Sequence, residues 1–191
     1  MTAELAALLL DPAEVAASAG PGVEAAVLVP IYGWPDEPGM IFTERRADLR
    51  RHAGEISFPG GRRDPGDADL AATALRETAE EIALDPAVVE LRGALPAIST
   101  FVTNYRVHPF VGLVPDPLEL NLQPNPGEVE TVLTVSLQRL REGYEMRRLV
   151  RRGVPIRTPT YELDGGQLIW GATARILGEF IDRLDAADAP A

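Results

Sequence analysis

The pattern of predicted elements fits an α/β sandwich built on a mixed β-sheet, although the pattern alone does not fix that architecture. Apolar, β-rich runs lie on both sides of one central amphipathic helix, and a second long helix closes the chain. The length of 191 residues suits one domain with a substantial core, and no internal repeat or low-complexity block interrupts it. We expect residues 1–184 to form this single domain and residues 185–191 to be a frayed, disordered tail.

The N-terminal part of the chain predicts short helices followed by strands. Residues 3–18 predict one or two helices, since Asp11-Pro12 has the form of an N-cap followed by proline at the first helical position. Residues 24–31 and 40–45 are β-rich apolar runs separated by a turn-rich segment, so each predicts a strand. Residues 54–58 are short and extended, and the turn Pro59-Gly60-Gly61 ends them.

The central helix is expected to begin near Asp67 to Asp69, because residues 64–67 have the composition of a turn and either Asp can cap a helix. Asp85-Pro86 marks its end. One arc of this helix carries the side chains expected to face the core, which are Ala71, Ala74, Leu75, Thr78 and Ile82.

Three carboxylates, Glu77, Glu80 and Glu81, lie off that arc and close to one another, because spacings of three and four residues share a helix face. Each close pair of like charges costs about 0.2–0.5 kcal/mol. Hard divalent ions such as Mg²⁺ bind through a few carboxylates, and substrate phosphates complete the shell. The cluster therefore favours a metal-dependent enzyme acting on phosphates, although a Glu-rich face is also typical of an ordinary solvated helix.

The C-terminal half predicts more strands and two helices. Residues 138–143 form a candidate short helix, and a final helix is expected from about Ala172 to Leu184. The β-rich segments of this half are 88–95, 106–114, 131–137, 155–163 and 167–170.

Composition excludes several kinds of chemistry. The chain has no Cys, all eighteen basic residues are Arg, and only two His are present. Thiol catalysis, Cys-based zinc sites and Schiff-base lysines are therefore excluded, and carboxylate chemistry remains by elimination. The formal net charge of −11 argues against nucleic-acid binding. Residues 45–63 nevertheless hold six Arg, and such a basic segment beside an acidic helix suits a polyanionic substrate bridged by metal.

No stretch of the sequence is long and apolar enough to span a bilayer. The N-terminus lacks the cationic start of a signal peptide. We therefore expect a cytoplasmic protein without membrane partners.

The central helix and the preceding loop resemble the Nudix box, G-x5-E-x7-R-E-U-x-E-E-x-G-U, where U is a bulky apolar residue. The matching positions are Gly61, Asp67, Arg76, Glu77, Glu80, Glu81 and Leu84. Asp67 stands in place of Glu, with one extra residue between it and Arg76, which leaves the role of Asp67 open. Thr78 and Ala83 replace the first bulky residue and the last glycine, whereas the core R-E-x-x-E-E is intact.

A segment just upstream resembles the signature of the coenzyme A pyrophosphatase branch, L-L-T-x-R-S-x3-R-x3-G-x3-F-P-G-G. The matching positions are Thr43, Arg45, Arg50, Gly54 and Phe58 to Gly61, whereas Arg46 replaces the serine. Weaker similarities are the segments 125–129, which resembles N-P-x-E-V, and 170–174. The two motifs together cover residues 41–84.

These resemblances imply a Nudix-like α/β/α sandwich around a mixed sheet and a Mg²⁺- or Mn²⁺-dependent pyrophosphohydrolase. The implied reaction cleaves the diphosphate of coenzyme A or acyl-CoA to 3′,5′-ADP and 4′-phosphopantetheine or its acyl derivative. Two alternatives remain open, a Nudix pyrophosphatase for a dinucleotide or nucleoside triphosphate and a catalytically silent nucleotide-binding domain. A homodimer is a further possibility.

The resemblance also assigns roles to residues. Glu80 and Glu81 are the expected principal metal ligands, Glu77 a third ligand or the base that activates water, and the Gly60 carbonyl a further ligand. Arg76 is expected to orient a glutamate, or simply to pair with Glu80 one turn later. Outside the box, Glu128 is a candidate second-site ligand or alternative base, with an ordinary loop Glu as the other interpretation. The candidates for binding substrate are Arg45, Arg50, His52 and Gly61.

Overall fold

A computed structural model describes residues 2–17, 21–48, 54–100, 104–151 and 153–188. The expected strands and helices form at or close to their expected positions. In chain order the elements are α1 (Thr2–Ala7), α2 (Pro12–Ala17), β1 (Val23–Tyr32), β2 (Gly39–Arg45), β3 (Ile56–Ser57), β4 (Gly60–Arg62), α3 (Leu70–Ile82), the 3-10 helix η1 (Pro86–Val88), β5 (Glu90–Ala94), β6 (Ile98–Ser99), β7 (Tyr105–Leu113), β8 (Val129–Ser136), α4 (Leu137–Glu142), β9 (Tyr144–Arg151), β10 (Val154–Glu162), β11 (Leu168–Ile169) and α5 (Gly171–Asp188).

The main sheet is mixed, as predicted. Its path runs β3-β2-β1-β7-β5, with β4 paired to β1, β6 to β7 and β8 to β2. Strands β1 and β7 are parallel over nine residue pairs, from Val23↔Tyr105 to Ile31↔Leu113, whereas the other pairs are antiparallel. A smaller antiparallel sheet has the order β11-β10-β9.

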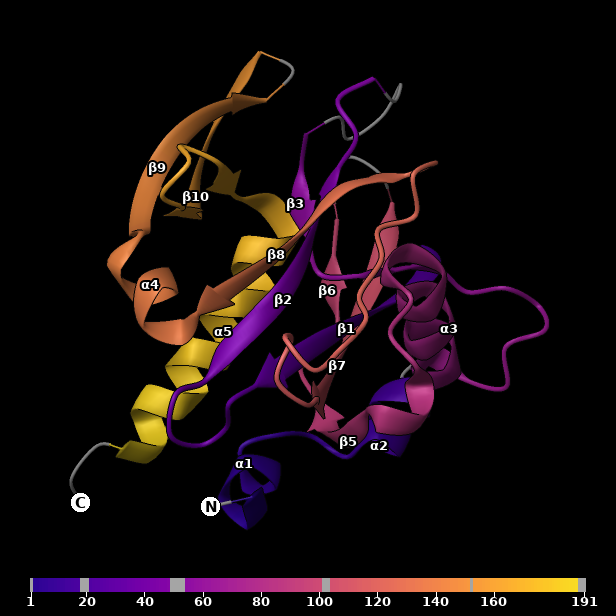
Figure 1. The fold of residues 1–191 in the computed structure, drawn as a ribbon. Helices are drawn as coiled ribbons and strands as arrows, with labels where there is room; N and C mark the ends of the chain where they lie inside the picture. The colour runs from indigo at the N-terminus through magenta and orange to yellow at the C-terminus, as the bar shows by residue number, and fades with distance from the viewer. Residues whose placement is uncertain (1, 18–20, 49–53, 101–103, 152, 189–191) are drawn as a thin grey trace.

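Helices α3 and α5 cover opposite faces of the main sheet (Figure 1). Successive residues of a strand point to opposite faces, so Leu28 of β1 joins the apolar cluster under α3 while Val29 joins the cluster under α5. In the α5-side cluster, Phe42 and Phe58 stack with their ring centroids 4.7 Å apart. This layering confirms the α/β sandwich with a helix on each face.

The structure adds three strands that the sequence did not predict, which are β4, β9 and the two-residue strand β6. Gly60 to Arg62, expected as a turn, forms the short strand β4, which pairs with residues 25–27 of β1. Strand β9 was not predicted because Arg147, Arg148 and Arg151 interrupt any apolar alternation. It forms as the hairpin partner of β10, with Tyr144 opposite Tyr161 and Arg151 opposite Val154.

The C-terminal helix is longer than predicted. It continues through Asp188, so the tail expected at 185–191 is helical for its first four residues, and 189–191 lie outside the described residues. An ion pair between Asp185 and Arg141 of α4 fixes this last turn against the rest of the fold. The assignment of residues 1–184 to a single domain stays a prediction. No helix in the described part of the chain has the length and apolar character needed to cross a bilayer.

Candidate active site

Helix α3 packs its apolar side on the sheet, and its carboxylates lie beside that apolar side, two of them against strand β4. The buried residues are Leu70, Thr73, Ala74, Thr78 and Ile82. Asp69 caps the helix, because its carboxylate accepts a hydrogen bond of 2.7 Å from Ala72 N–H. Thr78, which replaces a bulky residue of the Nudix-like pattern, donates its hydroxyl to Ala74 O at 2.6 Å and so satisfies its polar atom inside the core.

Gly60, the first residue of β4, links this strand to helix α3 through a hydrogen bond. Its backbone N–H donates to Glu81 Oε2 at 3.1 Å, and its φ of 149° lies in a region that favours glycine. A Cβ at this position would lie 2.3 Å from Ala26 O, so no larger residue fits here without displacing β1. The expected role of the Gly60 carbonyl as a metal ligand stays a prediction.

Gly61 lies directly against Glu77. A Cβ on Gly61 would lie 2.5 Å from Glu77 Oε2, so a side chain there would push the carboxylate aside. The double glycine thus lets the β4 backbone approach two of the three helix carboxylates, Glu77 and Glu81.

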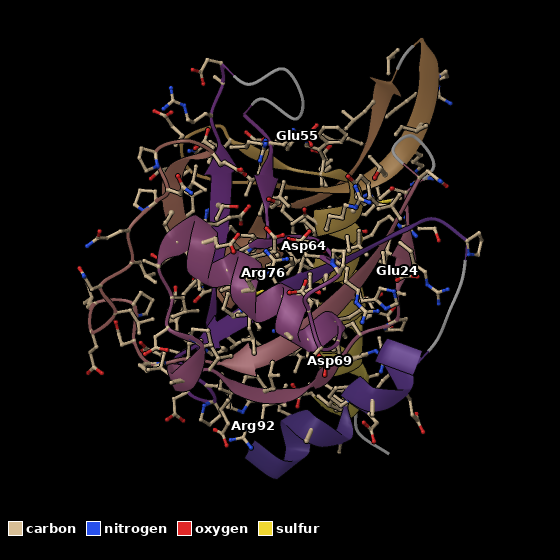
Figure 2. All side chains as sticks on the ribbon, turned by 90° about the vertical axis from the view of Figure 1, so that its right-hand side faces the viewer. Glu24, Glu55, Asp64, Asp69, Arg76 and Arg92 are labelled. Carbon is tan, nitrogen blue, oxygen red and sulfur yellow. The ribbon has the colours of Figure 1, made fainter. Side chains whose placement is uncertain are left out.

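Arg76 organises the outer part of the site. Its Nε and Nη2 donate to the two carboxylate oxygens of Asp67 at 2.8 and 3.0 Å, and it also contacts Glu77 at 3.1 Å and Glu80 at 3.2 Å. Arg76 thus forms the expected ion pair with Glu80 and also contacts Glu77, whereas its role in orienting a glutamate stays a prediction. Figure 2, which faces α3, shows Arg76 on this outer surface.

Asp67, whose role the sequence left open, is the anchor of that guanidinium. Its side chain is only 6% exposed and also accepts hydrogen bonds of 2.9 Å from the Asp64 N–H and the Thr73 hydroxyl. The hydrogen bond from Arg76, together with these donors, holds the pKa of Asp67 well below its usual range. In turn, Asp67 raises the pKa of Arg76.

Burial and neighbouring negative charges both raise the pKa values of Glu77 and Glu81. Burial raises the pKa of Glu81 to about 7, against the opposing effects of the Gly60 N–H and Arg45. Burial also raises the pKa of Glu77, and Arg76 opposes that shift. Glu128 raises the pKa of both groups further, which shows that the three carboxylates share one electrostatic environment.

The segment that carries Glu128 is attached to the C-terminal end of α3. Asn125 donates its backbone N–H to Glu81 O at 2.8 Å and its side-chain amide to Glu80 O at 3.3 Å. Glu128 Oε2 lies 3.2 Å from Arg45 Nη1 at the end of β2. This connection brings the upstream basic motif, the Asn125–Glu128 segment and the acidic helix into one site.

Within the described ranges, no three acidic or histidine side chains are already arranged to hold a metal ion. Arg76 forms ion pairs with the Glu80 carboxylate and with one carboxylate oxygen of Glu77. The donor set nevertheless fits a hard divalent cation, because Glu77, Glu81 and Glu128 are carboxylates whose mutual repulsion a cation would relieve.

The structure describes some of the other predicted site residues, whereas others lie outside the described ranges. Glu80 is more than half exposed and turned toward Arg76, so its role as a principal ligand stays a prediction. Arg45 lies in the site, whereas Arg50 and His52 lie outside the described residues. Sequence reasoning missed Arg46, whose Nη1 donates to Pro126 O at 2.5 Å, because that position departs from the motif and gave no signal.

Comparisons with known proteins agree with the Nudix resemblance of the sequence. The NUDIX domain family matches residues 23–153. An uncharacterized Nudix hydrolase, NudL, from Escherichia coli O1:K1 / APEC is 41% identical over 160 residues, which cover 82% of this chain and 80% of that protein.

Solved structures share the fold. A Nudix hydrolase from M. smegmatis, RenU, superposes with a TM-score of 0.58 at 13% identity, covering 91% of this chain and 99% of its own. The NUDIX domain of Shewanella oneidensis NrtR, complexed with ADP ribose, has a TM-score of 0.50 at 18% identity, covering 70% and 88%.

Proposed function

This chain belongs to the Nudix family of pyrophosphohydrolases, and from that premise we propose that it hydrolyses the diphosphate linkage of coenzyme A or acyl-CoA. Water adds to one phosphorus and the bridging P–O bond breaks, which gives 3′,5′-ADP and 4′-phosphopantetheine or its acyl derivative. Nudix enzymes generally use divalent cations, and here we propose Mg²⁺ or Mn²⁺.

One observation supports this choice of substrate most directly. Arg45 belongs to the segment that resembles the coenzyme A pyrophosphatase signature, and its Nη1 lies 3.2 Å from Glu128 Oε2. Glu128 in turn shares the environment of Glu77 and Glu81. This contact supports the proposal that the segment resembling the coenzyme A pyrophosphatase signature acts in the same site as the helix carboxylates.

The carboxylates Glu77, Glu80 and Glu81, with the Gly60 carbonyl and Glu128, are the residues proposed to hold the cation. When bound, a divalent cation neutralises the diphosphate and lowers the pKa of a bound water. Arg76, anchored by Asp67, keeps the Glu77 and Glu80 carboxylates in place.

We assign the proton transfer to Glu77, with Glu128 as the alternative base. Glu77 is partly buried, and burial raises its pKa toward the range in which a carboxylate accepts a proton near neutral pH. Gly61 leaves the Glu77 carboxylate open to the approaching diphosphate. Arg45, Arg50 and His52 are proposed to bind the diphosphate or the 3′-phosphate, since guanidinium groups pair well with phosphate.

Mass spectrometry of the products tests this proposal. Coenzyme A incubated with the protein and Mg²⁺ in ¹⁸O-labelled water is expected to yield 3′,5′-ADP and 4′-phosphopantetheine, and the label identifies the attacked phosphorus. Much faster turnover of NADH, a dinucleotide or a nucleoside triphosphate in the same assay would show that the substrate is another diphosphate. Absence of turnover with every substrate would favour a silent binding domain.

A further inference from the structure

Strands β9 and β10 form a hairpin whose tip projects away from the rest of the fold (Figure 1). Six large apolar side chains of the described residues are exposed, and four of them lie on this hairpin, which are Tyr144, Met146, Val150 and Ile156. Single exposed apolar residues are ordinary, whereas a group of them on one element indicates an interaction surface. None of the proposed site residues lies on the hairpin, so the diphosphate chemistry does not account for this group.

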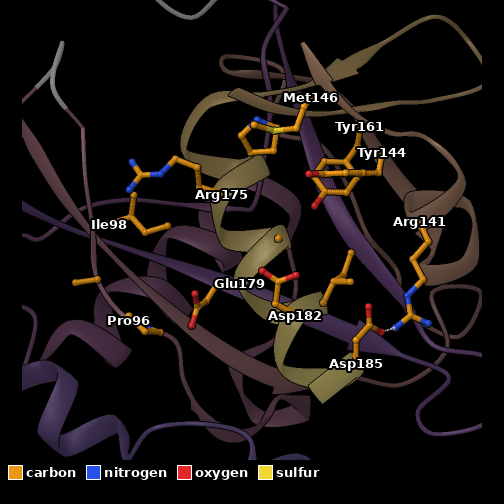
Figure 3. A pocket seen from close by; sticks show the side chains of 14 residues that line it. Pro96, Ile98, Arg141, Tyr144, Met146, Tyr161, Arg175, Glu179, Asp182 and Asp185 are labelled. Carbon is orange, nitrogen blue, oxygen red and sulfur yellow. Dashed lines mark hydrogen bonds and ion pairs between the residues drawn. The ribbon is translucent and has the colours of Figure 1, made fainter. Parts of the chain in front are cut away.

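Three of these four residues share one face of the hairpin. Successive side chains of a strand point to opposite faces, so Tyr144, Met146, Arg148 and Val150 lie on the same side of β9. Tyr144 and Met146 line a cavity of about 810 Å³ between the hairpin and α5 (Figure 3), so this is the face turned toward α5. We call it the inner face. Beyond the cavity it continues toward the tip with Arg148 and Val150, which are both exposed.

The tip of the inner face is basic. Arg148 lies directly opposite Arg157 in the hairpin register, and neither forms an ion pair with another described residue. Like charges directly opposite each other destabilise an antiparallel pair, so an acidic partner at this position would remove that cost. Residues 144–157 hold five of the eighteen Arg and one Glu, in a chain whose net charge is −11.

The base of the hairpin lies beside acidic residues of α5. Arg141, three residues before β9, pairs with Asp185, which places this part of α5 at the base. Asp182, about one helical turn earlier, also lines the cavity, is exposed and has no ion pair within the described part of the chain. The surface formed by the inner face and α5 therefore has unpaired negative charge at one end and unpaired positive charge at the other.

This order of charges makes the surface complementary to a second copy of itself. A two-fold axis sets each residue of a contact pair against its counterpart twice, once in each direction. With the two hairpins antiparallel, the tip of each copy lies over the base of the other. Arg148 then meets Asp182 at both ends of the contact, and the exposed Met146 and Val150 are covered between them.

Pairing of two β9 strands edge to edge is the other two-fold arrangement that the hairpin offers. Strand β9 is the edge of the smaller sheet, which has the order β11-β10-β9. Such pairing would bring Arg147, Arg148 and Arg151 of two copies together, and arginines on an edge strand oppose that contact. Contact through the inner face avoids this repulsion.

We propose that the chain forms a two-fold homodimer in which the inner face of each hairpin docks against α5 of the other copy, with Arg148 of one copy paired with Asp182 of the other. The Arg-rich tip alone would also attract nucleic acid or an anionic membrane, but the acidic residues of α5 repel both. The proposal concerns the assembly of the chain and does not depend on the proposed substrate.

Exchange of the two charges tests the proposal. Arg148→Glu and Asp182→Arg each place like charges at both symmetric contacts, so each is expected to raise the dimer Kd at least about tenfold. The double variant Arg148→Glu/Asp182→Arg restores opposite charges and should return the Kd to within about threefold of wild type. Glu119→Arg, beside the C-terminal end of α3, changes the net charge as Asp182→Arg does and is the control.

Sedimentation velocity from about 1 to 100 μM gives each Kd, and circular dichroism checks that each variant is folded. A wild-type chain that stays monomeric over this range would overturn the proposal. So would a dimer whose Kd neither single variant changes, or a double variant that dimerises as weakly as the single variants. A monomer that binds a DNA duplex or phosphatidylserine vesicles, and loses that binding in Arg148→Glu, would identify a different occupant of the hairpin.

Discussion

Gly60 and Glu81 are joined by a hydrogen bond of 3.1 Å from the backbone N–H to Oε2, which ties the acidic helix to strand β4. The contact places a carboxylate whose pKa is raised to about 7 beside a backbone that only glycine can adopt. The proposed metal site depends on this contact, because it fixes one of the proposed carboxylate ligands against the backbone of β4.

Replacing Gly60 by Ala should damage both the fold and the site. The new Cβ would lie 2.3 Å from Ala26 O, and φ at this position is 149°, so β4 must move away from β1. We expect a loss of about 1–3 kcal/mol in unfolding free energy, measured by urea denaturation. Gly66→Ala, where a Cβ meets no atom within 4 Å, is the control and should change stability little. Equal stabilities for the two variants would contradict the strain at Gly60.

Asp67→Asn should lower activity about 10- to 100-fold, because Arg76 loses its anchor and no longer positions Glu77 and Glu80. Steady-state kinetics with a saturating divalent cation would measure it. Asp64→Asn is the control, since Asp64 bonds to Asp67 through its backbone N–H and carbonyl, which the substitution keeps. Loss of activity in the control alone would show that Arg76 is positioned by other contacts.

Asp67→Asn should also change how the stability of the folded protein depends on pH. The pKa of Asp67 is lower in the folded chain than in the unfolded chain, so its ionised form stabilises the fold above the unfolded pKa of about 3.9. That stabilisation is lost as pH falls below about 4 toward the folded pKa. Thermal unfolding between pH 7 and pH 2 should show wild type more stable than Asp67→Asn at pH 7, with the difference shrinking below pH 4. A constant difference would argue against this linkage.

Ala83→Gly should stabilise the protein. Ala83 ends α3 at φ 56°, a left-handed conformation that costs alanine about 1–2 kcal/mol and glycine almost nothing. After the entropy that glycine adds to the unfolded chain, a gain of about 0.5–1 kcal/mol remains. Thermal or urea unfolding would measure it. Ala79→Gly, inside the same helix, should instead destabilise by about 1 kcal/mol, so a loss in both variants would contradict the cap assignment.

Arg45→Gln should raise KM for coenzyme A more than it lowers kcat, because the proposed role of Arg45 is to bind phosphate. Glu128→Gln should lower kcat instead if Glu128 acts on the cation or the water. Initial-rate measurements separate the two effects. Arg157→Gln on the exposed hairpin is the control, and an equal rise of KM in the control would indicate general loss of positive charge.

The parts of the site that sequence predicted are local. Glu77, Glu80 and Glu81 share a helix face because of helical geometry, and Asp69 is a cap of a type the sequence signals. Gly61 was predicted to lie at the site, and its close approach to Glu77 agrees with that. Residues that the chain brings together through such short-range rules can be found without a structure.

The parts that sequence did not predict depend on contacts between distant segments. Strand β9 carries three arginines and becomes a strand only through its pairing with β10. Asn125 docks on the end of α3 across more than forty residues, and Arg46 reaches Pro126 across eighty. Both carboxylate oxygens of Asp67 accept hydrogen bonds from Arg76. The sequence did not predict this contact, because Asp67 is shorter than the Glu of the Nudix box and lies one residue farther from Arg76 along the chain.

The central proposal is that Glu81, with Glu77 and Glu80, binds a divalent cation that contacts the substrate diphosphate. The most direct measurement is the Mg²⁺-dependent rate of coenzyme A hydrolysis by Glu81→Gln, with thermal unfolding of the variant recorded alongside it. We predict a loss of about a thousandfold or more in kcat with the fold intact, since the charge stabilisation from a metal is worth several kcal/mol. A folded Glu81→Gln variant that turns over coenzyme A at the wild-type rate would contradict the account.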